Sequence, residues 1–182
     1  MVPPDSALDT QRLQLRRTVA SDGKDFLELD SDPEVMRFIN GGRPSSPTDV
    51  ARWLAQATEC AWTARAAEDG RFIGWFSLRP TAPDEHELGY RLRRAEWGKG
   101  LATEGSLALV ARAFDDPSVR RIWAQTMTVN QASRRVMERV GLEFVRTFFG
   151  EWDDAIPGGE HGDVEYELTC AGWLNRGGSS TL

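Results

Sequence analysis

The stretch Arg94–Glu104, which reads RAEWGKGLATE, holds the residues whose types and spacing best suit the binding of an anion. Gly98 and Gly100 stand two residues apart, directly before a segment whose apolar residues recur at helical spacing. Such glycines let the backbone turn tightly, and a helix that begins there directs its free amides and positive dipole end to one place. The pattern predicts a pyrophosphate site, where Lys99 either adds a charge or points to water. A simple turn before a helix is the alternative.

Two common phosphate-binding motifs are excluded. A P-loop needs a glycine five residues before Gly98 and a Ser or Thr after Lys99, and neither is present. In the dinucleotide fingerprint a third glycine would occupy the position of Thr103. The loop therefore predicts an anion site of a different family.

Composition narrows the function classes further. The chain has 182 residues and a net charge of −6, which favours a single soluble domain and disfavours general binding of nucleic acid. Cys60 and Cys170 fit no metal spacing, and only His86 and His161 supply imidazole, so we predict no metal site. Residues 1–10 lack the features of a signal peptide, and no apolar run suits a membrane span. The expected location is cytoplasmic.

The chain around the loop alternates strand and helix patterns and predicts a mixed α/β fold. Strands are expected over Arg12–Arg17, Trp62–Ala66, Arg71–Leu78, Glu87–Leu92, Ile122–Val129, Phe144–Phe149 and Val164–Thr169. Turns are expected at Glu68–Gly70 and Pro80–Asp84. Helices are expected to begin at Pro33 and near Ser46, and to span Leu101–Phe114 and Asn130–Val140, the last with Ala132, Val136 and Val140 facing inward. We predict a flexible segment over 1–10, one domain over 11–174 and a flexible tail over 175–182.

Several segments, taken in this order, resemble the GNAT acyltransferases, and in particular their RimJ/RimL-like branch. They are QRLQLR from Gln11, SDPEVM from Ser31, ELGYRL from Glu87, WGKGLATE from Trp97 and NQASRRVMERVGL from Asn130. The resemblance runs from Arg12 to about Trp173. It implies a central mixed, mostly antiparallel sheet with helices on both faces and splayed central strands, which part near Gly89.

The resemblance also implies acetyl-CoA as co-substrate. Its pyrophosphate would rest on the amides of Trp97, Gly98, Lys99, Gly100, Leu101, Ala102 and Thr103. Its pantetheine arm would pair with the backbone of Tyr90, Arg91 and Leu92, and its thioester end would lie near Asn130 and Ser133. Trp97 stands where other members often have Gln or Arg, as is usual in this branch. Without the resemblance, Asn130 and Ser133 are equally well explained as partners of the local helix backbone.

The catalytic groups are less clearly marked. Many family members have a Tyr that protonates the leaving thiolate, and Met137 occupies its place here. Because Met cannot donate a proton, Ser133 or a water is the expected substitute. Glu87 is the candidate base, with Glu85 on the same strand face as its rival. Replacing Glu87 by Gln is predicted to lower kcat/KM at least about tenfold below pH 8.

The predicted function is therefore an acetyl-CoA-dependent N-acetyltransferase. A primary amine, either a protein or peptide N-terminus or a small molecule, would attack the thioester directly. Carboxylates near the cleft, including Asp153 and Asp154, would attract the amine cation. A catalytically weak acyl-CoA-binding or sensor module and a nucleotide-phosphate binder are the alternatives. The expected partners are the amine and, in a homodimer, a second copy; a monomer is equally compatible.

Overall fold

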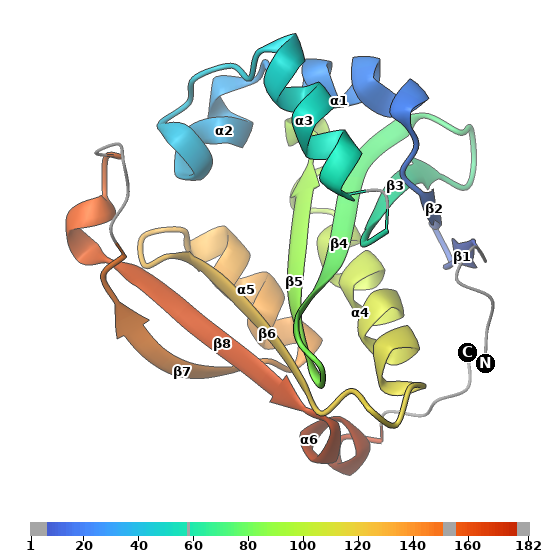
Figure 1. Ribbon diagram of the computed structural model, residues 1–182, viewed down its shortest axis with the longest axis vertical. Coiled ribbons are helices and arrows are strands. Elements are labelled where there is room, and N and C mark those ends of the chain that lie inside the picture. The colour runs from blue at the N-terminus through green and yellow to red at the C-terminus, as the bar shows by residue number, and fades with distance from the viewer. Residues whose placement is uncertain (1–6, 58, 151–155, 178–182) are drawn as a thin grey trace.

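The computed structural model describes residues 7–57, 59–150 and 156–177, and its strands form one eight-stranded sheet (Figure 1). The strands are β1 Leu8–Asp9, β2 Leu13–Arg17, β3 Ala61–Ala66, β4 Phe72–Ala82, β5 Glu85–Leu92, β6 Arg121–Met127, β7 Glu143–Phe148 and β8 Asp163–Thr169. Their order in the sheet is β1-β2-β3-β4-β5-β6-β8-β7. Only the central β5–β6 pair is parallel, and every other neighbouring pair is antiparallel. The sheet is mixed and mostly antiparallel, as predicted.

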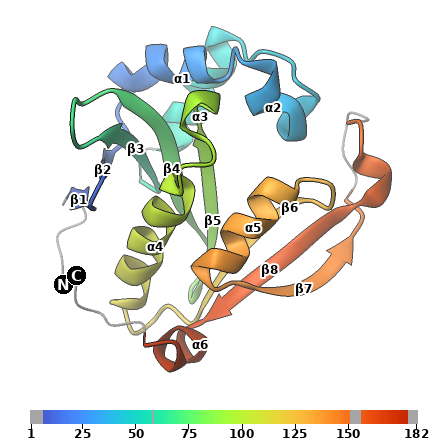
Figure 2. The same ribbon diagram turned by 180° about the vertical axis from the view of Figure 1, so that it is seen from behind.

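Helices cover both faces of this sheet, as Figure 2 shows from behind. The α-helices are α1 Gly23–Leu29, α2 Pro33–Asn40, α3 Pro47–Ala57, α4 Leu101–Phe114, α5 Gln131–Val140 and α6 Cys170–Asn175, with 3-10 turns η1 Ala20–Asp22, η2 Arg94–Glu96 and η3 Gly159–His161. On β4, Phe76 and Leu78 face the core that α4 covers, whereas Phe72 and Trp75 pack with α1 and α3. The two faces of β4 thus support the two groups of helices.

Local sequence signals explain where the helices near the site begin and end. The Asp32 carboxylate accepts from the amide of Glu34 at 2.9 Å and caps α2, with Pro33 in its first turn. The side chain of Asn130 accepts from the amide of Ser133 at 3.2 Å and caps α5. Gly141 ends α5 in the left-handed region, at φ 104°.

One predicted boundary is wrong. The sequence places the end of the second hairpin strand at Leu78 and a turn at Pro80–Asp84, but β4 continues to Ala82. The pairing of β4 with β3 ends at Ser77, so Pro80 lies where β4 pairs only with β5. A proline that lacks its N–H is tolerated at such a free edge. The strand therefore extends past Pro80.

The sequence also missed β1, α1 and α6. The helix α1 begins at Gly23 after Asp22, a residue type that often caps helices, but the Asp22 carboxylate accepts from Arg16 and Thr63 instead of from the helix amides. Leu8–Asp9, within the segment predicted to be flexible, pair with β2. In α5 the buried residues are Met137 and Val140, whereas Ala132, which was predicted to face inward, is exposed.

Candidate functional site

The glycine loop between η2 and α4 has the backbone conformation that an anion site needs. Gly98 and Gly100 adopt φ values of +72° and +80°, which side-chain-bearing residues rarely adopt. Gly100 is the N-cap of α4, and no side chain caps the first turn of that helix. A Cβ at Gly100 would lie 3.5 Å from the Arg12 guanidinium, an ordinary contact, so among the protein's own atoms it is the positive φ that calls for glycine here. The first amides of α4 are therefore available to an anion.

A carboxylate in the first turn of α4 anchors the glycine loop on the side away from the cavity. Glu104, in the first turn of α4, accepts from the Arg12 amide at 2.8 Å, from Arg12 Nε at 2.7 Å and from Thr10 Oγ1 at 2.6 Å. The Arg12 guanidinium also donates to the Lys99 carbonyl at 2.8 Å. Burial alone would raise the pKa of Glu104, but these hydrogen bonds outweigh it and lower the pKa. The start of β2 is thus tied to the loop.

Lys99 does not contribute to the cavity that the loop faces. Its Nζ donates to Glu96 Oε2 at 3.0 Å, and the other Glu96 oxygen accepts from Arg71 Nε at 3.2 Å. Lys99 lines a separate hollow beside Gln11 instead. The Lys99 side chain, half of which is exposed, is thus ion-paired with Glu96.

The central strands part where the sequence predicted. The parallel pairing of β5 with β6 covers only Glu85–Glu87, whereas β5 pairs with β4 as far as Leu92. On its β6 side the stretch 88–92 therefore has no strand partner among the described residues. At position 89 a Cβ would lie 2.7 Å from Ser77 Oγ, so a larger residue there would require the Ser77 side chain to move. The free edge can pair with an extended ligand chain.

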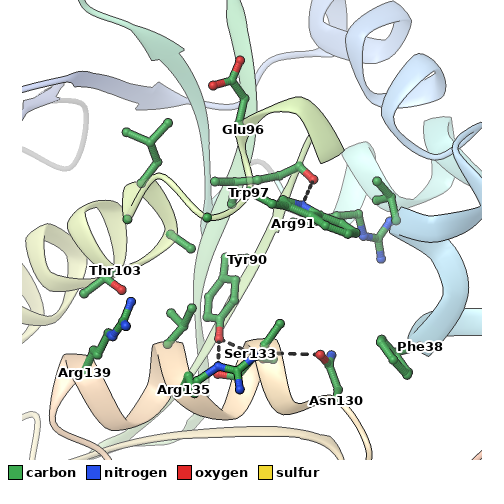
Figure 3. A pocket seen from close by; sticks show the side chains of 18 of the residues that line it. Phe38, Tyr90, Arg91, Glu96, Trp97, Thr103, Asn130, Ser133, Arg135 and Arg139 are labelled. Atoms are coloured by element: carbon green, nitrogen blue, oxygen red, sulfur yellow. Dashed lines mark hydrogen bonds between the residues drawn. The ribbon is translucent and has the colours of Figure 1, made fainter.

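One cavity of about 320 Å³ is lined by the free edge of β5, by the glycine loop and by residues of α2, α4 and α5 (Figure 3). The residues predicted for the cofactor site that line this cavity are Tyr90, Arg91, Leu92, Trp97, Gly98, Gly100, Leu101, Ala102, Thr103, Asn130 and Ser133. The indole of Trp97 donates to the Leu92 carbonyl at 2.9 Å and ties the loop to the end of β5. Lys99 and Glu87 are the predicted site residues that the structure does not bring to this cavity.

Glu87 lies on β5 at the last residue paired with β6, and both of its oxygens have partners. Oε2 is ion-paired with Arg79 on β4, and Oε1 accepts from Gln125 Nε2 at 3.4 Å. Its rival Glu85 pairs with Arg121 at 3.0 Å. Asp153 and Asp154, two further carboxylates predicted for the cleft, lie outside the described residues, whereas Glu160 and Asp163, predicted with them, do not line the cavity.

Asn130, Ser133 and Tyr90 form a hydrogen-bonded group at one side of the cavity (Figure 3). Besides capping α5, Asn130 donates from Nδ2 to Thr126 Oγ1 at 3.0 Å. The Tyr90 hydroxyl lies 2.9 Å from Ser133 Oγ and 3.1 Å from the Ser133 carbonyl oxygen. Burial raises the pKa of Tyr90 to about 12. Met137 is buried, with 2% of its surface exposed, and packs in the core.

Two further arginines line the cavity and were missed. Arg135 and Arg139 are four residues apart on α5, so they share one helix face. In the described part of the chain, neither side chain has a hydrogen-bond or ion-pair partner. Their neighbour Arg134, in contrast, donates to Tyr166 at 3.1 Å and to the Thr128 carbonyl at 3.1 Å. The spacing is visible in the sequence, but only the fold shows which arginines face the cavity.

The described residues contain neither a cluster of metal-binding side chains nor a helix that could span a membrane. Within residues 7–57, 59–150 and 156–177, no group of three His, Cys, Asp or Glu side chains is placed to hold a metal ion. The helices of the same residues are all too short or too polar to cross a membrane.

Comparison with known proteins gives consistent matches. The acetyltransferase (GNAT) domain family matches residues 12–143. A transacetylase of Aspergillus fumigatus, named FsC-acetyl coenzyme A-N(2)-transacetylase, is 35% identical over 92% of this chain and 77% of its own length. Spermidine N-acetyltransferase of Vibrio cholerae, solved with CoA and spermine, superposes with a TM-score of 0.76 at 16% identity over 91% of this chain and all of that chain (100%). The ribosomal alpha-N-protein acetyltransferase RimL, solved with CoA, gives 0.75 at 16% identity over 90% and 98%.

Proposed function

The chain belongs to the GNAT acetyltransferase family and is an N-acetyltransferase, and on that premise we propose that it transfers the acetyl group of acetyl-CoA to a primary amine by direct attack on the thioester. GNAT acetyltransferases use acetyl-CoA, and the residues of the cavity suit that co-substrate. The observation that carries the proposal is the joining of a glycine loop with free helix amides to an unpaired strand edge in one cavity. The amides suit the pyrophosphate, and the edge suits the amide groups of pantetheine.

The charges around the cavity support one direction for the bound co-substrate. Arg139 lies beside Thr103 of the first turn of α4, which suits phosphates, and Arg135 lies nearer to Ser133 (Figure 3). Phe38 lies on the side of Asn130, away from Arg139 (Figure 3). The thioester would then lie near Ser133, whose hydroxyl contacts the hydroxyl of Tyr90. Acetyl transfer needs this arrangement, because the acceptor must reach the acyl carbon without crossing the phosphate end.

The acceptor that we propose is an amine, either a protein or peptide N-terminus or a small molecule. The names of three similar proteins describe acetylation of an N(2) position, of spermidine and of a protein α-amine. An α-amine with a pKa near 7.7 to 8.0 is neutral at the level of roughly one molecule in ten at pH 7, and a lysine-like amine at roughly one in a thousand. An α-amine therefore needs less help from a base. Membership of the RimJ/RimL-like branch is part of this proposal.

The test follows release of the CoA thiol with a thiol reagent. Three acceptors are compared: a lysine-free peptide with a free N-terminus, an N-acetylated peptide with one lysine, and spermidine. We expect acetyl-CoA-dependent thiol release with at least one of them, with an acetylated amine confirmed by mass spectrometry. CoA binding without thiol release from any amine would instead support the acyl-CoA sensor, and equal competition by ATP would support a nucleotide-phosphate binder.

A further inference from the structure

The hydroxyl of Tyr90 has one proton and two acceptors within reach. The carbonyl oxygen of Ser133 lies at 3.1 Å, and Ser133 Oγ lies at 2.9 Å. Both groups belong to the first turn of α5, whereas Tyr90 comes from β5. The two elements face each other across the cavity (Figure 3). The acceptor that receives the proton decides what the Ser133 hydroxyl can do.

The carbonyl oxygen has less need of that proton. In an α-helix the carbonyl of residue i accepts from the amide of residue i+4, so the helix supplies Met137 N–H to the Ser133 carbonyl. Ser133 Oγ has Tyr90 as its hydrogen-bond partner and no other among the described residues. If Tyr90 donates to this oxygen, the proton of Ser133 itself is left free on a side chain that lines the cavity.

We propose that Tyr90 is a positioning residue, which donates to Ser133 Oγ and thereby reserves the Ser133 proton for the sulfur of the thioester. The inference rests on the proposed function, because it concerns the leaving group of that transfer. The amine nitrogen bonds to the acetyl carbon, the carbon–sulfur bond breaks, and its electron pair leaves on sulfur. The hydrogen bond from Ser133 stabilises this charge. The proton that the amine loses becomes the thiol proton, so Ser133 and Tyr90 keep their own.

Neither Met137 nor the phenol of Tyr90 itself can serve as the acid for the leaving sulfur. Met137 is buried in the core and has no proton to donate. Because burial raises the pKa of Tyr90 to about 12, the phenol keeps its proton near neutral pH and acts as a donor rather than as an acid. The pair therefore does by hydrogen bonding what a single acidic side chain would do by proton transfer.

The chain contains a matched control, because it has only two tyrosines and both bind α5. Tyr166 on β8 is more deeply buried than Tyr90, and its hydroxyl accepts from Arg134 Nε at 3.1 Å and donates to Glu138 Oε1 at 3.1 Å. Tyr166 does not line the cavity. Tyr90→Phe and Tyr166→Phe each remove one buried hydroxyl that holds the same helix, but only the first touches Ser133.

The first experiment needs no acceptor amine. CoA is bound to wild type, Tyr90→Phe, Ser133→Ala and Tyr166→Phe, and the thiol is titrated by the ultraviolet absorbance of its thiolate. The charged groups that line the cavity are Glu34 of α2, Arg91 of β5, and Arg135 and Arg139 of α5, with Glu96 beside the loop, and all are unchanged in these variants. We expect the bound thiol to titrate about one pH unit higher in Tyr90→Phe and in Ser133→Ala, and as in wild type in Tyr166→Phe.

The second experiment measures steady-state kinetics with the amine that wild type acetylates fastest. Tyr90→Phe and Ser133→Ala should each lower kcat about ten- to a hundredfold with little change in KM for acetyl-CoA, as loss of one hydrogen bond to a charge predicts. The double variant should lose no more than either single one, since both act through one proton. Thiol titrations that coincide in wild type and Tyr90→Phe would overturn the inference, as would equal losses in Tyr166→Phe. Either result would leave amine acetylation itself intact, whereas absence of acetylation by wild type would remove the proposed function.

Discussion

The arginines around α1 and those on the cavity face of α5 are held in opposite ways. Arg16 donates to the buried Asp22 carboxylate at 2.9 Å, and Arg65 pairs with Asp25 at 2.6 Å. Arg135 and Arg139 line the cavity and have no partner within the described residues. The same residue type is thus neutralised inside the protein in one region and left for a ligand in the other.

The difference follows from what each region must do. A buried carboxylate such as Asp22 is costly to desolvate unless charged and neutral donors surround it, and once paired it fixes β2 and β3 around it. An arginine that faces an open cavity stays hydrated and raises the local positive potential. An incoming phosphate then supplies its partner. Under the proposed function, pairing therefore separates the arginines that stabilise the fold from those that bind the co-substrate.

The strongest test of this comparison is Asp22→Asn. Only 2% of Asp22 is exposed, and its carboxylate accepts from Arg16, from Thr63 Oγ1 at 2.6 Å and from the Val19 amide at 3.0 Å. We expect the free energy of unfolding in urea to fall by about 3 kcal/mol, because a neutral amide leaves the partner charge uncompensated. The affinity for CoA in calorimetry should stay the same.

The control for that variant is Asp69→Asn. Asp69 is also paired with an arginine, Arg71, at 2.8 Å, but half of its side chain is exposed (51%). Its removal should leave the free energy of unfolding close to that of wild type, as is usual for a surface ion pair. Equal losses in the two variants would show that burial does not set the strength of these pairs.

The sequence predicted structural features that neighbouring residues determine, and it missed features that depend on contacts between residues far apart in the chain. The helix α5 was predicted because its start at Asn130 and its end at Gly141 are encoded locally. The extension of β4 past Pro80 was not, because it depends on where β3 stops pairing. The helix α1 was missed because its stability comes from Phe26 and Leu29 packing in the core rather than from a capping residue.

The same distinction holds for the site. The loop from Trp97 to Thr103 is contiguous, and apart from Lys99 its residues line the cavity as predicted. The contact of Tyr90 with Ser133 joins residues 43 apart in sequence, so no local pattern indicates it. The ion pair of Glu87 with Arg79 depends on the register of β4 and β5. Contacts between elements thus account for what sequence reasoning missed.

The second prediction concerns the arginines without partners. The double variant Arg135→Gln/Arg139→Gln should weaken CoA binding about thirtyfold, from roughly 1 kcal/mol for each charge-assisted phosphate contact. Its free energy of unfolding should stay within about 0.5 kcal/mol of wild type, because no contact inside the protein is lost. Calorimetry with CoA and urea unfolding measure the two quantities.

Arg120→Gln is the matched control, since Arg120 is exposed at the start of β6 and does not line the cavity. We expect this variant to bind CoA as wild type does, because one surface charge alone has little effect at a distance in salt. Unchanged CoA affinity in the double variant would contradict the assignment of the cavity face of α5 to phosphate binding.

The third prediction is the pH dependence of stability. Burial by itself would raise the pKa of Asp22, but hydrogen bonds from Arg16, Thr63 and the Val19 amide outweigh it, and the pKa is lower than that of an ordinary aspartate. Arg65 faces the same carboxylate at 3.9 Å. The stabilisation is therefore complete above the unfolded pKa of about 3.9 and is lost as the pH falls below it toward the folded value.

Urea unfolding between pH 3 and pH 7 measures this effect. The stability difference between wild type and Asp22→Asn should be constant from about pH 5 upward and should narrow as the pH falls below about 4. A difference that is the same at every pH would show that the Asp22 charge contributes nothing and that only the shape of the side chain matters.

The smallest effect is expected for Glu87. Its pairing in the structure indicates one role and the sequence pattern indicates another. The sequence predicts a base, and hence a loss of at least about tenfold in kcat/KM for Glu87→Gln below pH 8. The pairing in the structure predicts that Glu87 stabilises the sheet, because Glu87 is ion-paired with Arg79 across β4 and β5 and does not line the cavity. We expect a change of about threefold or less, the size of a partly exposed ion pair. Profiles of kcat/KM from pH 6 to pH 9 measure it.

Glu85→Gln and Arg79→Gln complete that test. Glu85 points to the same face of β5 and pairs with Arg121 at 3.0 Å, so it matches Glu87 in type and pairing. If Arg79→Gln and Glu87→Gln change kcat/KM alike, the pair acts as a unit and holds β5 where it leaves β6. If Glu87→Gln alone loses tenfold and recovers at pH 9, Glu87 is a base in spite of its ion pair. An ion pair would then not distinguish a structural residue from a catalytic one on β5. The assignment of Arg135 and Arg139 to phosphate binding would still be tested separately by calorimetry with CoA.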